Sequence, residues 1–277
     1  MQKMSTGQKL LLPSDDPVTN VRLSRLNREE AALTQYRDNI GALKVRLQQN
    51  ETALSGMNSD LLEARDLMVW ALDGANTPED VAAMSSSLTA LSSSLFYSAN
   101  TRDQEGRYLF SGTASATASV TYDATASLGS RYSFTGNTSR QEVVVANGVG
   151  QSANVTVEEL PAILNQLENA AALLQAPGVN VSDPLVHPQL QAALDGVDTV
   201  MSSVSSKVAG LGGMQNILDT LDTNHADVSL SNKQALMDLG QLDYGDAAVK
   251  LNGYTTALQA SQKAYAQVSK LSLFDVL

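Results

Sequence analysis

The residues with the clearest potential for chemistry are two adjacent carboxylates, Asp15 and Asp16, in the stretch "PSDDP". Paired acids can serve as general acid and base or hold a metal ion, but either role needs further acids or histidines close by. The sequence identifies no second cluster of this kind. An aspartate directly before a proline is typical of a helix start, so we expect Asp16 to cap a helix that begins at Pro17. Asp15 would then interact favourably with the positive end of the helix dipole.

The other candidate groups give no catalytic pattern. His187 lies in a predicted loop, and His225 falls on the apolar stripe of a predicted helix without a second histidine nearby, which favours a packed residue over a ligand. The chain has no cysteine, which excludes disulfides, thiolate metal sites and a cysteine nucleophile. GxSxG, Walker A, HExxH and GxGxxG are absent from the sequence. We therefore predict no catalytic residue, metal or cofactor, and an enzyme is the least favoured class.

Charge and hydropathy narrow the choice of partners. The 277 residues include 18 Lys and Arg against 29 Asp and Glu, a net charge of −11, which argues against binding to nucleic acid or to an anionic membrane surface. No apolar run approaches the ~18 residues that a membrane-spanning helix needs, and the first residues do not have the pattern of a conventional signal peptide. The sequence predicts neither a nucleic-acid partner nor a membrane partner.

Long helices dominate the predicted architecture. Apolar residues recur every seven positions in two series, the pattern of a coiled-coil seam, within a predicted helix from about residue 17 to Leu72. The series are Leu33, Ile40, Leu47, Leu54, Leu61 and Met68, and Tyr36, Leu43, Met57, Ala64 and Ala71. A second helix is expected to start at a Thr77 cap with Pro78 in its first turn, and to end near Gly106. Asn50 also falls on the seam, as Asn232 does on the later long helix, and we expect both to set register.

A change of period marks an inserted β region. Alternating stretches such as "SVTYD", "SRYSF" and "QEVVVA" predict short strands in a Ser-, Thr- and Gly-rich segment. A short helix in 157–175 and a proline-rich loop follow, and a second long helix is predicted from Leu190 to Val228. The "GLGG" within that helix should be a point of close packing or of weakness.

The predicted fold class is mainly α: a long antiparallel helical rod with a small inserted β domain. The domains are an N-terminal long-helix part at 1–110, the β-rich insert at 111–160, C-terminal helices that complete the rod at 161–242, and a terminal helix at 243–277. That last helix carries an apolar stripe which needs a facing partner, so its residues are the candidate assembly site. They are Leu251, Tyr254, Leu258, Tyr265, Val268 and Leu271.

Three stretches carry a family resemblance. "MSTGQKLLLPSDDPVTNVRLSRLNREEAALTQYRDNI", "RDQEGRYLFSGT" and "LDYGDAAVKLNGYTTALQASQKAYAQVSKLSLFDVL" resemble the flagellin-like hook-associated proteins of the bacterial flagellum. The resemblance covers roughly residues 1–113 and 233–277 and agrees with the middle only in layout. In this family the "PSDDP" turn joins an inner terminal helix to the long helix. Members also carry a helical segment before the equivalent of Ser5, which the resemblance implies is missing from this sequence.

The resemblance implies a structural role outside the cell. It predicts a subunit exported by the flagellar type III apparatus and assembled as a ring between hook and filament, in contact with another hook-associated protein and with flagellin. A cytoplasmic export chaperone would cover its C-terminal helix. Two other functions stay open: the flagellin subunit of the filament itself, and, from another class, an intracellular coiled-coil adaptor.

Overall fold

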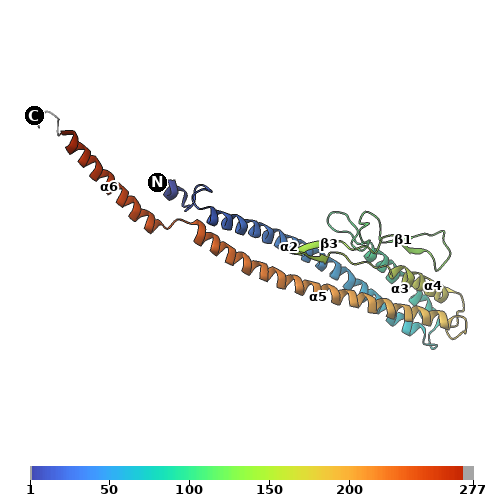
Figure 1. Ribbon diagram of the computed structural model, residues 1–277. Coiled ribbons are helices and arrows are strands. Elements are labelled where there is room, and N and C mark those ends of the chain that lie inside the picture. The colour runs from blue at the N-terminus through green and yellow to red at the C-terminus, as the bar shows by residue number, and fades with distance from the viewer. Residues whose placement is uncertain (1, 271–277) are drawn as a thin grey trace, which may run out of the picture. The chain divides into compact units, whose positions relative to one another are not determined.

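The computed structural model describes residues 2–270 and contains two compact units. The larger unit is formed by residues 36–223, and the smaller combines the chain up to Gln35 with the chain from Asn224 onward. In chain order the elements are α1 (Gln2–Thr6), α2 (Pro17–Ala71), α3 (Pro78–Ala99), β1 (Val120–Tyr122), β2 (Tyr132–Phe134), β3 (Glu142–Ala146), β4 (Val149–Ser152), α4 (Leu160–Gln175), α5 (His187–Gly240) and α6 (Tyr244–Lys270) (Figure 1). The mainly α fold with a small β region is confirmed.

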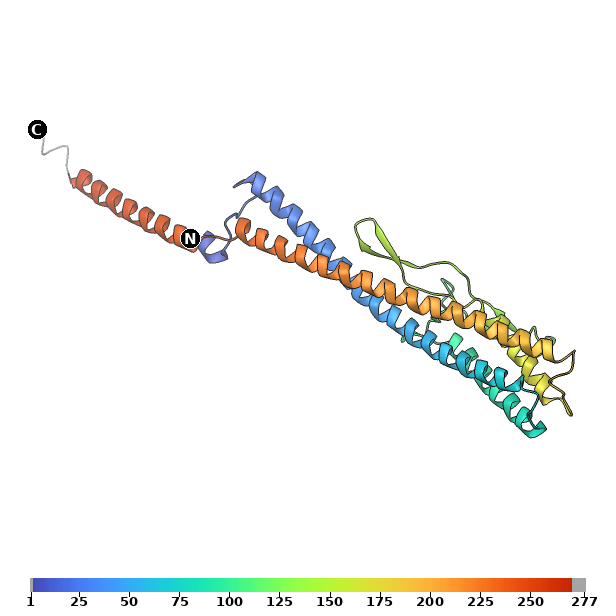
Figure 2. The same cartoon turned by 90° about the horizontal axis from the view of Figure 1, so that it is seen from below.

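The predicted seam forms the core of the larger unit. Its α2 positions from Ile40 to Ala71 are buried, and α5 runs antiparallel beside them with its own buried series at a spacing of seven (Figures 1 and 2). That series is Leu190, Val197, Val204, Leu211 and Leu218. Helices α3 and α4 complete the core, and the buried Ser85 hydroxyl donates to the Ala171 carbonyl at 2.7 Å where they meet. Each helix therefore buries one stripe against the others.

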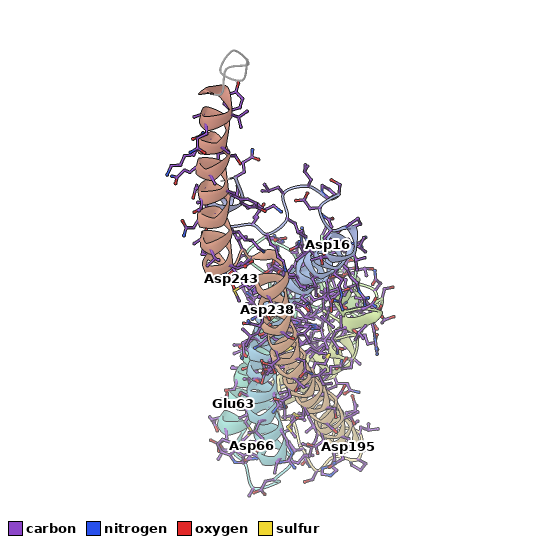
Figure 3. The ribbon with its side chains drawn as sticks, turned by 60° about the vertical axis from the view of Figure 1, so that its left-hand side comes forward. Asp16, Glu63, Asp66, Asp195, Asp238 and Asp243 are labelled. Carbon is purple, nitrogen blue, oxygen red and sulfur yellow. The ribbon has the colours of Figure 1, made fainter. Side chains whose placement is uncertain are left out.

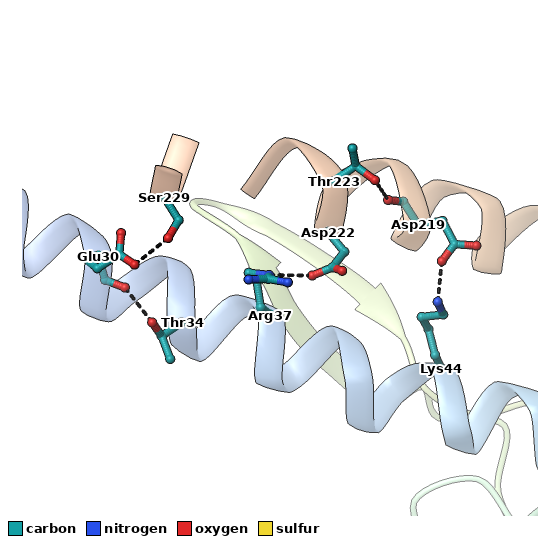
Figure 4. A network of polar contacts seen from close by, with 8 residues as sticks. All are labelled: Glu30, Thr34, Arg37, Lys44, Asp219, Asp222, Thr223 and Ser229. Atoms are coloured by element: carbon teal, nitrogen blue, oxygen red, sulfur yellow. Dashed lines mark hydrogen bonds and ion pairs between the residues drawn. The ribbon is translucent and has the colours of Figure 1, made fainter. Parts of the chain in front are cut away.

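A ladder of polar contacts flanks this seam, again with a spacing of seven on α2. The contacts join Arg37 to Asp222 at 2.8 Å, Lys44 to Asp219, Glu51 to Gln215 at 2.7 Å, Asn58 to Ser205 at 3.2 Å, and Arg65 to Asp198 at 2.7 Å. Figure 4 shows the first two. Exposed ion pairs stabilise a protein by at most about 1 kcal/mol each. Charges at such flanking positions mainly select the orientation and register of the two helices.

The smaller unit has a polar seam where the sequence predicted an apolar one. Val228 is 41% exposed, whereas Ser229 is 5% exposed, so the predicted stripe is wrong at Val228. The seven-residue series of α5 continues to His225 and Asn232, which are both buried at the stripe positions where the sequence placed them. Ser229 donates to the Glu30 carboxylate (Figure 4). The same carboxylate lies 3.1 Å from the Lys233 ammonium. The buried positions of Asn50 and Asn232 agree with their predicted places on the seam.

The β region consists of two antiparallel hairpins, β1 with β2 and β3 with β4. Its apolar residues Val120, Val145 and Val157 are buried in the same cluster as the seam. Polar bonds also tie it to the helices, since Asn39 Nδ2 on α2 donates to the Val144 carbonyl at 2.8 Å. The Asn165 amide on α4 pairs with both backbone groups of Tyr132 at 3.0 and 2.9 Å. The insert is thus packed as part of the larger unit.

Two local predictions are wrong, and for a third feature one of the two predicted explanations is excluded. Helix α3 ends at Ala99 instead of near Gly106, because the Asn100 amide bonds to both backbone groups of Val120 at 2.8 and 3.1 Å and so joins the helix end to β1. His187 is the first residue of α5 and does not belong to the loop. Close packing does not explain "GLGG", since a methyl group at Gly210, Gly212 or Gly213 would meet no heavy atom within 4 Å among the described residues.

Candidate assembly surfaces

The acidic pair "DD" lies at the start of α2 and organises two turns. Asp16 Oδ1 accepts from the Thr19 backbone N–H at 3.1 Å, and its Oδ2 accepts from the Thr19 hydroxyl at 2.7 Å, directly before Pro17. These hydrogen bonds, that of the hydroxyl first, lower the pKa of Asp16 below its ordinary value. This is the geometry of a helix N-cap.

Asp15 makes direct contacts in the chain before α2, in addition to the predicted interaction with the helix dipole. Its Oδ2 accepts from the Leu11 backbone N–H at 3.1 Å and lies 3.4 Å from the Lys3 ammonium. The Leu11 bond is the main reason why the pKa of Asp15 is lowered. Among the described residues no three His, Asp or Glu side chains gather in a way that could hold a metal ion. The carboxylates therefore shape the chain that leads into α2.

The same segment is bonded to the chain between α5 and α6. The Lys9 N–H donates to the Gly240 carbonyl and the Leu242 N–H donates to the Gly7 carbonyl, both at 2.9 Å. Gly7 has a φ of 69° in this short antiparallel bridge, and a methyl group there would lie 3.0 Å from the Tyr244 hydroxyl oxygen. The start of α6 is therefore attached to the N-terminal segment within the smaller unit.

Helix α6 presents the predicted apolar stripe to solvent. Leu251 is half-buried, whereas residues 252–269 are exposed along their whole length. The exposed stripe residues are Tyr254, Leu258, Tyr265 and Val268. Leu271, the last residue of the predicted site, lies outside the described residues. An exposed apolar stripe is typical of a surface that a partner covers.

The motif "YLFSGT" has a structural explanation. Phe110 is buried in the shared core, and the next turn docks on residues 136–137. Gly112 has a φ of 71°, and a methyl group on it would lie 1.9 Å from the Asn137 carbonyl oxygen. The Asn137 side chain in turn accepts from the Thr113 N–H at 3.0 Å. Only glycine fits both the backbone conformation and the space.

Two surface hollows on the larger unit were not predicted. One, of about 760 Å³, lies between the end of α3 and β1, and aromatic residues and Arg102 line it. The Arg102 guanidinium stacks 4.3 Å from the centre of the Tyr108 ring. The other hollow lies between α2 and α3 beside Trp70. Aromatic residues within a few positions of arginine or acidic residues are the sequence signal that could have indicated these hollows.

Comparison with known proteins identifies the family to which the chain belongs. Residues 1–115 match the bacterial flagellin N-terminal helical region, and residues 194–277 match the bacterial flagellin C-terminal helical region. A solved flagellar hook-associated protein structure from Vibrio parahaemolyticus is 31% identical, with a TM-score of 0.72 over 82% of this chain and 100% of that one. This chain belongs to the flagellin-like hook-associated protein family.

Further members of the hook-associated family agree with this assignment. Flagellar hook-associated protein 3 of Escherichia coli is 28% identical over 295 residues, which take in 99% of this chain and 91% of the relative. The flagellar junction protein FlgL of Legionella pneumophila shares the fold, with a TM-score of 0.60 at 14% identity over 78% of this chain and 100% of that one. The resemblance seen in the sequence is confirmed. Separately, none of the helices within residues 2–270 has the apolar length that a bilayer span requires.

Proposed function

We propose that this chain is a structural subunit of the bacterial flagellum that forms the junction layer between hook and filament. The observation that carries the proposal is the similarity to hook-associated protein 3 along 99% of the chain, which includes the insert as well as both flagellin-like ends. The fold supports it, because two long antiparallel helices with a small insert leave exposed apolar faces for neighbours. The chain functions through contacts with other subunits and catalyses no reaction.

The partners follow from this placement. Copies of the chain associate in a ring, with the preceding hook-associated protein on one side and flagellin on the other. The subunit is secreted through the flagellar type III apparatus, and before export a chaperone covers the apolar stripe of α6. The exposure of Tyr254, Leu258 and Tyr265 supports both uses of the stripe, since one apolar helix face can bind first a chaperone groove and later a neighbouring subunit.

Deletion of the gene tests the proposal. We expect the deletion strain to carry hooks without filaments, to release flagellin into the medium, and to regain motility when the wild-type gene is returned. Electron microscopy and swimming assays give the result. Normal filaments on the deletion strain would overturn the proposal.

The flagellin alternative is favoured by the two terminal matches, and abundance separates it from the junction role. A junction ring needs few copies for each filament, whereas flagellin is the main mass of a sheared flagellum. Quantitative mass spectrometry of washed, sheared flagella measures the ratio. Absence of the chain from that material would instead favour an intracellular adaptor.

A further inference from the structure

A groove on the larger unit combines an exposed tryptophan with an acidic rim. It lies between α2 and α3, has a volume of about 520 Å³, and has the half-buried Leu67 and Leu91 among its lining residues. Trp70 lines it while 53% exposed. The small side chains Ser87 and Ala90 line its α3 side, which leaves space for the side chains of another helix. A half-exposed tryptophan in such a hollow is typical of an interface hot spot.

Two carboxylates, Glu63 and Asp66, form the rim of this groove. They follow each other along one side of α2 (Figure 3). Glu63 makes no ion pair within residues 2–270, and the Asp66 contact with Arg65 is long, at 3.9 Å, because Arg65 bonds mainly to Asp198. The rim therefore offers negative charge that the rest of the described chain does not neutralise, next to an apolar surface.

The smaller unit carries a complementary surface, the arginine stripe on the first turns of α2. Its basic residues are Arg22, Arg25 and Arg28, all exposed and without an ion-pair partner in the described part of the chain. Val18 and Val21, at 73% and 66% exposed, share the face, which spans about 120° of the helix at 100° per residue. Glu29 also lies on this face, so the stripe keeps a net positive charge of two.

We propose that the arginine stripe of one copy docks in the Trp70 groove of a second copy. Valines would cover Trp70 while arginines pair with Glu63 and Asp66, so both the apolar and the charged parts match. The contact must join two copies, because stripe and groove lie on the same continuous helix, which cannot fold back on itself. In a chain with a net charge of −11, three arginines without an ion-pair partner among residues 2–270 are a place where another copy can approach without repulsion.

Such a contact is head-to-tail, since two different surfaces meet. Head-to-tail contacts build rings or helical layers, whereas a self-complementary contact would stop at a dimer. The inference rests on the proposed function, because it supplies a contact between two copies of the junction subunit. It goes further in naming the residues on both sides.

Trp70 supplies the first test, because it is the only tryptophan in the chain. We expect its fluorescence to shift to shorter wavelength as the concentration of purified full chain rises, and the midpoint to move at least about tenfold higher in Arg25→Glu. Arg140→Glu, an exposed arginine on the insert, is the matched control and should leave the midpoint unchanged. Equal behaviour of both variants would overturn the proposal.

Cross-linking gives the second test, since the chain lacks cysteine. Arg25→Cys and Asp66→Cys chains, produced separately and mixed under oxidising conditions, should form a disulfide-linked pair that Asp227→Cys does not form with Arg25→Cys. The same pair should appear in sheared flagella from a strain that makes both chains. No mixed pair in either sample, or linkage of Asp66→Cys to another flagellar protein instead, would overturn the proposal.

Complementation separates this inference from the proposed function. If the wild-type gene fails to restore motility to the deletion strain, the proposed function fails, whatever the variants do. If it restores motility, Arg25→Glu and Asp66→Arg alone should each reduce swimming, and the double variant should recover it. Full swimming by both single variants would reject the Trp70 contact and leave the junction role intact.

Discussion

At the scale of single residues, two aspartates that look catalytic and one glycine all have structural roles. Asp15 and Asp16 bond to backbone groups around the start of α2, and Gly112 lets two loops approach within contact distance. Each acts through a few named atoms. Single substitutions with matched controls can therefore measure these roles.

Gly112→Ala is expected to destabilise the larger unit by about 3 kcal/mol or more, because it adds backbone strain at positive φ to a clash with the Asn137 carbonyl. Gly148→Ala is the control, since Gly148 has nearly the same φ of 72° and no described heavy atom within 4 Å of the added methyl. Urea denaturation compares the two. If both variants lose the same stability, the close approach at Gly112 has no energetic consequence.

Asp16→Ala is expected to lower the melting temperature at neutral pH, with a deficit that shrinks in acid. The pKa of Asp16 is lowered in the folded chain by the Thr19 hydrogen bonds, so its carboxylate stabilises the fold above the unfolded-state pKa, about 3.9. That contribution is lost as the pH falls from about 4 through the folded pKa. Asp38→Ala, exposed on the same helix, is the control. A deficit that is unchanged at pH 3 would contradict the cap assignment.

At the scale of elements, the stability of a helix within the chain depends on whether its apolar stripe is covered by another helix. In the larger unit α2 and α5 bury their stripes against each other, whereas α6 leaves its stripe exposed. The same amphipathic pattern is therefore buried core in one place and exposed to solvent in another. The difference lies in whether a facing helix is present.

Leu54→Asn is expected to cost about 3 kcal/mol or more in stability, since the leucine is fully buried on the α2 seam and an amide there would lack a partner. Leu62→Asn on the same helix, 49% exposed, should cost less than about 1 kcal/mol. Thermal and urea unfolding followed by circular dichroism decide between them. Similar losses would mean that α2 is not held by its seam.

Helix α6 is expected to be the first helix to open in dilute monomer. The side chains of residues 252–269 are exposed, so their free energy of opening should be low, whereas Leu33 to Met68 on α2 should exchange slowly. Limited proteolysis should cut first between Tyr244 and Lys270, and hydrogen exchange there should be fast. Slow exchange across Leu251 to Val268 in a verified monomer would show that the stripe is covered within one copy.

At the scale of the whole molecule, the insert and the helices depend on one core. Sequence alone favours a separate module that can be removed with little effect, because Ser-, Thr- and Gly-rich chain leads into and out of the insert. The structure leads to the opposite prediction, since Val120, Val145 and Val157 are buried with the seam residues. Shared burial couples the stability of the two parts.

Deletion of residues 111–157 is therefore expected to lower the melting temperature of the helices substantially, by exposing the faces of α3 and α4 that the hairpins cover. Shortening the loop at 124–128, which is exposed except for the half-buried Ala126, removes chain from the insert away from the buried valines, and it should have little effect. Circular dichroism at the helix band measures both. A full deletion that melts like the wild type would restore the interpretation of the insert as a separate module.

The sequence by itself determined the long helices, the seam on α2, three of the four described strands and the family, because local period, caps and motif residues carry that information within short stretches. Tertiary structure decided where α3 ends, which polar residues of α5 meet the α2 ladder, and why Gly112 is needed. These features depend on pairs such as Asn100 with Val120 and Arg37 with Asp222, which lie far apart in the sequence. It also decided that the insert shares the core and that Trp70 lines a groove, since burial of an apolar residue depends on which elements pack over it.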